Sequence, residues 1–325
     1  MTVETTNVYA SNYQWLGIAL EDSWGVAPAG PTAWIPVTSP TYTPVPQLLS
    51  DQALRGMNGV DYGQQIGMIT STFSYTTYLY ADSVFSHLAA ILGPDTVTGD
   101  TAPYTHTASL LNNGQPPSYT LFYNDGSGSL LPISGAKASS VKFTIKSGGL
   151  VELAVSWVAK KAGDPVTGVN TPTTAIPMPA WTALISIAGN QYTKYSEVDW
   201  EFKRATAPIT ALTGTQDPSA IFAPGLEVDG TFTGIYQGVT DNDYANFLAN
   251  TQPGMSIVVT NQNDDTHSLT LQFSQIAYQV ASFSASSNYM EVKATTKALM
   301  NTTDATDGEM SPAKAILIST QSTAF

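Results

Sequence analysis

Polar and apolar residues alternate one by one in the segment 196–205, SEVDWEFKRA. Successive side chains of a β-strand point to opposite faces of its sheet, so the alternation predicts a strand with Val198, Trp200 and Phe202 on one face. The other face carries Glu197, Asp199, Glu201 and Lys203. We therefore expect one face on a core and one charged face in water. Only 11% of the residues are charged, so this concentration of charge needs an explanation.

The segment 225–235, GLEVDGTFTGI, repeats the arrangement. Leu226, Val228 and Phe232 are expected to face the core. The polar face carries Glu227, Asp229, Thr231 and Thr233. An ordinary solvated sheet face is one interpretation, but like charges on neighbouring strands repel by a few tenths of a kcal/mol to about 1 kcal/mol per pair. A neutral face would serve for solvation, as the corresponding residues of an upstream segment indicate: Thr70, Thr72, Ser74 and Thr76.

The composition favours a mainly β protein with short helices. Hydrophobic residues make up 42% of the chain, which is typical of a folded protein. Thr, Ser, Tyr, Val, Gly and Pro are abundant, which favours short strands joined by turns. By length alone, 325 residues fit one large β domain or two smaller ones.

Two parts of the chain resemble each other weakly. A shift of 159 residues sets the segment 71–90 over 230–249, with Thr72 on Thr231 and Asp82 on Asp241. Each copy predicts a strand, a polar turn and a short helix whose N-cap is Asp82 or Asp241. The helices are expected to bury two sets of side chains: Val84, Phe85, Leu88 and Ile91 in the first, and Tyr244, Phe247 and Leu248 in the second.

A second similarity, at a shift of about 138 residues, relates 118–160 to 256–298. The smaller shift implies extra residues in the first copy at about 94–117. Two β-rich stretches also resemble each other by chance, which is the alternative to duplication. With duplication, the expected organisation is a first fold at 1–165, a second fold at 166–300 and a C-terminal arm at 301–325, whose segment 313–320 is expected to form a strand that pairs with a neighbouring subunit.

Several classes of protein are disfavoured. The net charge of −13 leaves no basic surface for attractive nucleic-acid binding. Cysteine is absent, and His87, His106 and His267 are dispersed, so they are expected at the surface or at caps and not as metal ligands. We find no signal for secretion and no apolar run long enough to span a membrane. No catalytic, cofactor-binding or metal-binding residue is predicted, and hence no enzyme.

The order of these features resembles the major tail tube proteins of long-tailed, non-contractile bacteriophages. The segments that carry the resemblance are 15–37 (WLGIALEDSWGVAPAGPTAWIPV), 53–60 (ALRGMNGV) and 112–123 (NNGQPPSYTLFY). The resemblance implies an antiparallel β-sandwich or partial barrel flanked by a helix, related to the type VI secretion tube fold. It also implies that each fold adds about four strands to a large barrel formed on oligomerisation. The loops that would reach the next ring are at about 44–66 and 205–224.

For function, the resemblance implies stacked rings around a channel that conducts DNA during ejection. Two folds per chain imply trimeric rings with pseudo-sixfold symmetry, and hexameric rings are the alternative. Implied partners are further copies, the tail tip or baseplate, the tail terminator, and the tape measure protein and DNA inside the channel, without sequence-specific binding and without a membrane. The location implied is the virion tail, after synthesis in the host bacterial cytoplasm.

An acidic channel wall would repel phosphates and leave passing DNA without a binding site. The residues expected to line it are Glu197, Asp199, Glu201, Glu227, Asp229, Thr231, Thr233, Thr70, Thr72 and Ser74. By the shift of 159, positions 38, 40 and 42 match the three acidic residues of 197–201 and are Thr, Pro and Tyr. Either the register shifts there or the two folds line the channel unequally.

Two other classes remain open. One is another virion β protein, such as a capsid decoration or a tail-associated protein. The other is a carbohydrate-binding module or glycosidase, which would use aromatic platforms and paired carboxylates. That class ordinarily needs export, and no export signal is found.

Overall fold

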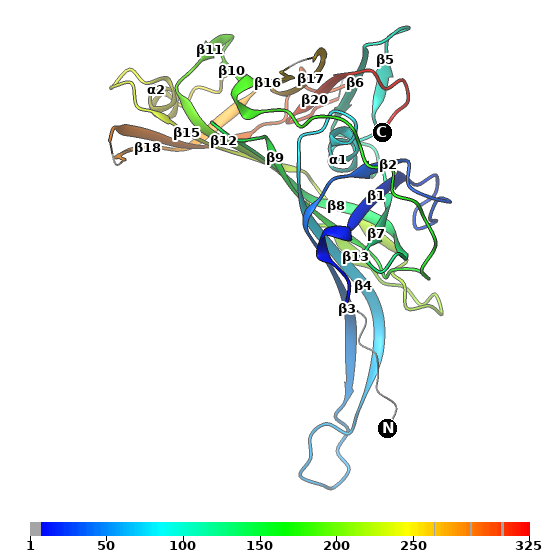
Figure 1. Ribbon diagram of the computed structural model, residues 1–325. Helices are drawn as coiled ribbons and strands as arrows, with labels where there is room; N and C mark the ends of the chain where they lie inside the picture. Colours follow the sequence, from blue (N-terminus) through cyan, green and yellow to red (C-terminus); the bar gives the residue numbers. More distant parts are fainter. Residues whose placement is uncertain (1–7, 263, 287, 307–308) are drawn as a thin grey trace.

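The computed structural model describes residues 8–262, 264–286, 288–306 and 309–325 and shows a mainly β protein with two short α-helices in these ranges (Figure 1). The predicted fold class is confirmed. Eight strands form one continuous antiparallel series in the order β3-β4-β9-β8-β12-β15-β19-β18. Their bounds, in that order, are Thr38–Asp51, Gly63–Tyr78, Glu152–Lys160, Leu130–Lys146, Tyr195–Lys203, Glu227–Ile235, Met290–Ala298 and Ile276–Ala285.

The same pairing order occurs twice in this series. In the first four strands the third and fourth along the chain, β8 and β9, exchange places, and in the last four strands β18 and β19 do the same. Phe73 on β4 pairs with Trp157 on β9, and Phe232 on β15 pairs with Ala294 on β19. The strand β8 of the first set pairs with β12 of the second and joins the two sets into one sheet.

The other strands form a second layer. β7, β1 and β2 continue from the N-terminal part of β8, whereas a seven-stranded sheet has the order β11-β10-β16-β17-β20-β6-β5. A small hairpin is formed by β13 and β14. The bounds of β1, β2, β5, β6, β7, β10, β11, β13, β14, β16, β17 and β20 are Trp15–Leu20, Ala33–Ile35, Thr96–Thr98, Tyr104–Ser109, Tyr119–Asn124, Leu184–Ile187, Asn190–Tyr192, Ala207–Ile209, Ala220–Phe222, Met255–Asn261, Asp264–Phe273 and Lys314–Ser319.

The C-terminal strand β20 lies inside the chain's own sheet. It pairs with β17 on one side and with β6 on the other. The expectation that this strand pairs with a neighbouring subunit is therefore wrong. β5 and β6 come from the segment 94–117, so the extra residues of the first copy form a hairpin, which β20 connects to β17.

The core lies between the layers, and the alternating segments supply it as predicted. Val198, Trp200 and Phe202 are all at most 1% exposed. The Trp200 ring stacks on Phe273 of β17 with a centroid distance of 3.7 Å. Large aromatic rings dominate such a core because each removes a large apolar area from water.

Both predicted helices form, but only α2 has the predicted N-cap. α2 (Asn242–Ala249) has Asp241 as its N-cap, which accepts from the Asp243 N–H, as predicted. α1 (Val84–Ile91) starts after Ser83 without a side-chain cap, and Asp82 accepts from the Thr173 hydroxyl instead. The expected apolar residues of α1 are buried, but on α2 Tyr244 and Phe247 are only partly buried and Leu248 is exposed. No helix within the described ranges is long and apolar enough to cross a membrane.

The hairpin of β3 and β4 extends away from the rest of the chain (Figure 1). Most of the segment expected as a loop at 44–66 belongs to these two strands, and only 52–62 connects them. The segment 205–224 folds back against this hairpin. The Gln216 carbonyl accepts from the Ile69 N–H at 2.8 Å, and Asp217 lies 3.2 Å from Lys160.

Candidate functional site: a polar strand face and two open sheet edges

The charged residues of β12 and β15 lie on the sheet face opposite the core. Glu197, Asp199 and Glu201 alternate with buried neighbours, and the cross-strand pairs Glu197 with Thr233, Asp199 with Thr231 and Glu201 with Asp229 bring the two strands together. Glu227 lies at the exposed end of β15 and pairs with Lys203. The sequence-based division into a core face and a polar face is confirmed.

Lysines from the flanking strands stand between these carboxylates. Lys142 of β8 lies 3.0 Å from Asp199, and Lys146 lies 3.9 Å from Glu197. On the other side, Lys297 of β19 lies 3.6 Å from Glu227. The predicted repulsion between carboxylates is therefore offset by opposite charges that β8 and β19 supply.

Lys203 binds two of the carboxylates from within the same pair of strands. Its Nζ lies 3.0 Å from Glu201 and 3.7 Å from Asp229. The hydrogen bond that Lys203 donates to the Glu201 carboxylate raises the pKa of Lys203 above its ordinary value. This face is thus a set of ion pairs, which the sequence analysis missed. Its signal was present in the alternation of Lys142 and Lys146 in KFTIK.

The other half of the face is neutral. Thr70, Thr72 and Ser74 of β4 alternate with buried residues and point away from the core. They pair across to β9 and lie three strands from β12. All ten sequence-predicted residues thus lie on one face of the continuous sheet, in a charged part and a neutral part.

The register resolves which residues of β3 correspond to the acidic ones of β12. Tyr42 pairs with Phe73, whereas Val198 pairs with Phe232. Because Phe73 and Phe232 correspond, Tyr42 corresponds to Val198. The counterparts of the three acidic residues are then Thr41, Thr43 and Val45. The register is shifted by three residues, and the two sets of strands also differ in charge.

β3 and β18 are the two open edges of the series. Each pairs with only one strand in the part of the chain that the structure describes. Even-numbered residues of β12 direct their backbone groups to β8, since Arg204 N–H donates to Ser139 and Ser196 accepts from Ser147. Trp200 and Phe202 share this orientation, and their counterparts on β3 are Pro44 and Pro46.

The edge of β3 therefore carries proline nitrogens where β12 offers donors to β8. Pro44 and Pro46 have no N–H, and proline at an edge weakens uncontrolled addition of strands from other chains. Their carbonyl groups remain available as acceptors. This edge can accept hydrogen bonds from a suitably placed strand but donates fewer than β12 does.

The histidines do not form a site. His87 is 0% exposed, and its Nε2 lies 2.7 Å from the Tyr75 hydroxyl. His106 is equally buried between Asp95 and the Gln321 carbonyl, at 2.7 and 2.9 Å. The expectation of surface or capping positions is wrong for both. No group of three or more His, Asp or Glu side chains within the described residues is arranged to hold a metal ion.

These features define a mainly β protein whose antiparallel sheet has a twice-repeated strand order, a polar face and two open edges in the part of the chain that the structure describes. The sequence matches the family model of phage tail tube proteins over residues 15–316, and the chain belongs to this family. A search of curated proteins finds no significant match. The chain is therefore a structural protein of the phage virion tail, where copies assemble with other tail proteins into the tube.

Proposed function

We propose that the chain forms trimeric rings with pseudo-sixfold symmetry that stack into the tail tube. The observation that supports this proposal is the repeated strand order. On this basis we infer two tube folds, at 1–165 and 166–300, that would each contribute four strands, with 301–325 as a C-terminal arm. Three chains would then supply six folds. Hexameric rings, with one wider channel, are the alternative.

The junction between β8 and β12 provides a template for ring closure. In this junction Val141 pairs with Phe202 and Phe143 pairs with Trp200. β9 corresponds to β19, because Trp157 and Ala294 pair with the equivalent residues Phe73 and Phe232. Val155 is then equivalent to Val292. Their partners Val141 and Phe283 are therefore equivalent too, so β18 corresponds to β8. The β18 edge of one copy would therefore meet the β3 edge of the next. Closure in this way leaves no unpaired edge in the ring.

The face opposite the core would line the channel. We propose that its ion pairs keep passing DNA from being held, because Lys142, Lys146, Lys203 and Lys297 are engaged by carboxylates and are not free to bind phosphate. The net charge of −13 adds a general repulsion. The role is conduction of DNA during ejection, with no bond made or broken and no cofactor.

The hairpin of β3 and β4 would connect successive rings. Apolar side chains are exposed along it and at its end, which is typical of a surface that another protein covers. They are Leu48, Leu49, Leu54, Met57, Val60 and Ile66. The segment 205–224 braces the base of the hairpin through Gln216.

Other contacts follow from a tube of this kind. We propose the tail tip or baseplate and the tail terminator as partners at the two ends, and the tape measure protein and then DNA as contents of the channel. The chain would be synthesised in the host bacterial cytoplasm before it joins the virion tail.

Electron microscopy of tubes formed by the purified protein tests the ring symmetry. Cross-sections should contain three copies of the chain per ring, each with two similar lobes. Six copies per ring would overturn the trimer in favour of the alternative. Particles without stacked rings would contradict the tube arrangement itself. Deleting 52–62 should leave single rings intact and prevent stacking, and a variant that still forms long tubes would contradict the role of the hairpin.

A further inference from the structure

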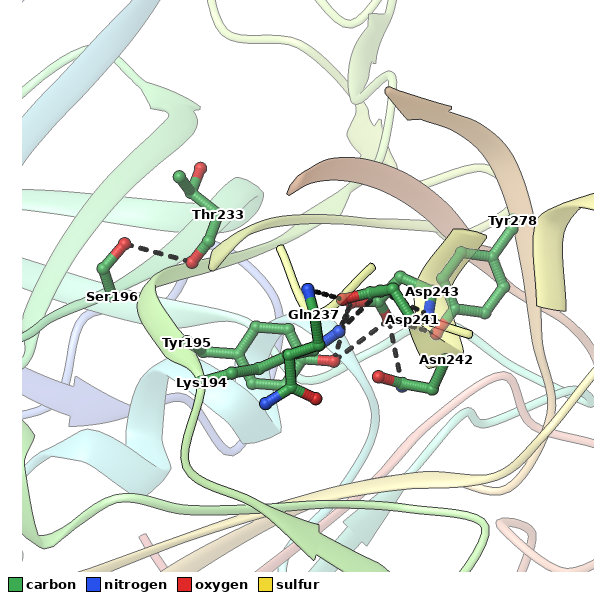
Figure 2. A network of polar contacts seen from close by, with 9 residues as sticks. All are labelled: Lys194, Tyr195, Ser196, Thr233, Gln237, Asp241, Asn242, Asp243 and Tyr278. Carbon is green, nitrogen blue, oxygen red and sulfur yellow. Dashed lines mark hydrogen bonds and ion pairs between the residues drawn. The ribbon is translucent and has the colours of Figure 1, made fainter. Parts of the chain in front are cut away.

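A lysine and two aspartates are buried together where β12 begins and α2 begins (Figure 2). The side chain of Lys194 is 1% exposed, and those of Asp241 and Asp243 are 0% exposed. Lys194 directly precedes β12, whereas Asp241 is the N-cap of α2 and Asp243 lies in its first turn. The assembly proposed above uses none of these residues.

Asp241 is held by backbone groups. Its Oδ1 accepts from Lys194 Nζ at 2.7 Å and from the Asp243 N–H at 3.0 Å, and its Oδ2 accepts from the Gln237 N–H at 3.1 Å. Backbone N–H donors and the helix N-terminus stabilise a charged carboxylate. These contacts fix the Asp241 carboxylate beside Lys194 Nζ, where it can take part in proton transfer.

Asp243 has a different set of partners. Its Oδ2 lies 2.8 Å from Lys194 Nζ, and its Oδ1 accepts from the hydroxyls of Tyr195 and Tyr278 at 3.0 and 2.8 Å. Asn242 Nδ2 is a further contact of Oδ1 at 3.3 Å. Burial raises the pKa of both tyrosines, so their hydroxyls stay protonated and donate to this carboxylate. The Tyr195 hydroxyl lies equally close to Oδ2, at 3.0 Å, so Tyr278 is the tyrosine donor dedicated to Oδ1. A donor fixed on Oδ1 also stabilises the charge that this oxygen gains when a nucleophile attacks the carboxyl carbon.

The cluster holds three buried charges with a net charge of minus one. Removing charges from water is expensive, and a buried pair recovers the cost only with excellent geometry. Forming an amide from the ammonium of Lys194 and the carboxylate of Asp243 eliminates two of the three charges. The Asp241 carboxylate then remains, with its two backbone donors and the new amide N–H.

We propose that Lys194 and Asp243 form an intramolecular isopeptide bond. Asp241 accepts a proton from Lys194 and passes it to Oδ2 of Asp243, and the neutral Nζ then attacks Cγ of the protonated carboxyl group. The bond between Nζ and Cγ forms while the Cγ–Oδ2 bond breaks. Oδ2 leaves as water with two protons that come from the ammonium group, one of them relayed by Asp241. An ammonium and a carboxylate thus give one amide and one water, with no oxidant, metal or cofactor.

The geometry of the product also uses the observed contacts. The amide oxygen would be Oδ1, which keeps the Tyr278 hydroxyl and stays within reach of the Tyr195 hydroxyl, and the amide N–H would point to Oδ1 of Asp241. The bond would fix the start of β12 to the start of α2. It would join Lys194 to Asp243, which are 49 positions apart in the sequence. At the matching place in the first set of strands, Asp82 accepts from Thr173 and has no such lysine contact among the described interactions. The cross-link is therefore specific to the second set.

The intact mass of the purified full chain tests the proposal. We expect it to be lower by one water than the mass calculated from the sequence, and peptide mapping should find the segments around Lys194 and Asp243 joined. An intact mass equal to the calculated value overturns the bond and leaves a buried ion cluster. This measurement needs no variant and so does not depend on the folding of one.

Variants assign the roles of the two aspartates. Asp243→Asn should still react and lose ammonia in place of water, because a carboxamide carbon is attacked in the same way. Asp241→Asn should show the full calculated mass, since the proton acceptor is lost. If Asp241→Asn and not Asp243→Asn loses ammonia, Asp241 is the acylated residue and the assignment is overturned. Lys137→Met is the matched control, because Lys137 is also buried but donates to the Pro116 carbonyl, and it should keep the loss of one water.

Discussion

Lys142 Nζ lies 3.0 Å from Asp199 Oδ2 across the junction where β8 meets β12. This junction joins the two sets of four strands, and on the core side of the same strands Phe143 pairs with Trp200. Charge pairing on one face and aromatic packing on the other thus act on one pair of strands. The two contributions differ strongly in size, because only the aromatic side is removed from water.

The pair of Lys142 and Asp199 is expected to contribute little to the stability of the subunit. Their side chains are 39% and 23% exposed, and ion pairs in contact with solvent are typically worth about 0.2–1 kcal/mol. A double-mutant cycle with Lys142→Met and Asp199→Asn, measured by urea unfolding of unassembled subunits, should give a coupling in that range. A coupling well above it would mean that the pair holds the junction.

Arg204 is expected to matter much more. Its guanidinium donates to the carbonyls of Ile91, Leu92 and Pro224 at 2.7, 3.3 and 2.7 Å, and so ties the end of β12 to the C-terminal end of α1. Arg204→Met leaves the carbonyls of Ile91 and Pro224 without this donor, at about 1–3 kcal/mol for each buried group, whereas the Leu92 carbonyl still accepts from the Leu111 N–H. We expect a total loss of roughly 3–5 kcal/mol in the free energy of unfolding.

Arg204→Lys is the control for charge alone. Lysine keeps the positive charge but lacks the planar fork that reaches several acceptors. The free energy of unfolding of Arg204→Lys should lie between those of the wild type and Arg204→Met. Equal stability of all three proteins in urea unfolding would contradict the capping role.

The alternating segments gave the most reliable sequence-based predictions. Val198, Trp200 and Phe202 were placed in the core because a period of two has a direct structural meaning in a strand. The N-cap at Asp241 was also found, since a carboxylate before an amphipathic segment is a local signal. That the polar face lines a channel stays a prediction.

The failures concern partners that are distant in the sequence. Local spacing shows that Glu197 and Asp199 share a face, but only strand pairing brings Lys146 and Lys142 beside them. Likewise, β20 was recognised as a strand, and its position between β17 and β6 depends on the whole arrangement of the outer sheet. His87 follows Val84 by three residues and precedes Ile91 by four, which places it beside the apolar face of α1, but its partner Tyr75 comes from another element and does not follow from local spacing.

Stability should fall in mild acid because of His87. Burial lowers the pKa of His87 from 6.5 to about 4. As the pH falls below 6.5, the unfolded chain binds a proton that the folded chain does not, so this contribution to stability is complete above pH 6.5 and is lost as the pH falls toward 4. At about 1.4 kcal/mol per pKa unit, the loss is roughly 3 kcal/mol.

His87→Gln removes the titration while keeping a polar side chain. The difference in unfolding free energy between wild type and variant should shrink by that amount between pH 7 and pH 4, measured in urea at fixed ionic strength. Tyr75, which contacts His87, does not titrate there because burial raises its pKa. Parallel pH profiles of the two proteins would contradict a neutral, buried His87.

The open edge of β18 should control ring formation without controlling folding. The Ser286 N–H bonds to Tyr289 within the hairpin, so the N–H of Ala285, one residue earlier, points to the open side. Ala285 is the β18 counterpart of Phe143, and Pro44 is the β3 counterpart of Trp200, and Phe143 pairs with Trp200 at the junction. In the proposed ring the Ala285 N–H would therefore donate to the Pro44 carbonyl of the next copy. Ala285→Pro removes this donor and adds a ring where the two strands would meet.

For Ala285→Pro we expect subunits with wild-type thermal stability that remain monomeric in size-exclusion chromatography and form no tubes. Ala285→Ser, which keeps the N–H, should still assemble. Normal tubes from Ala285→Pro would show that copies join through another surface.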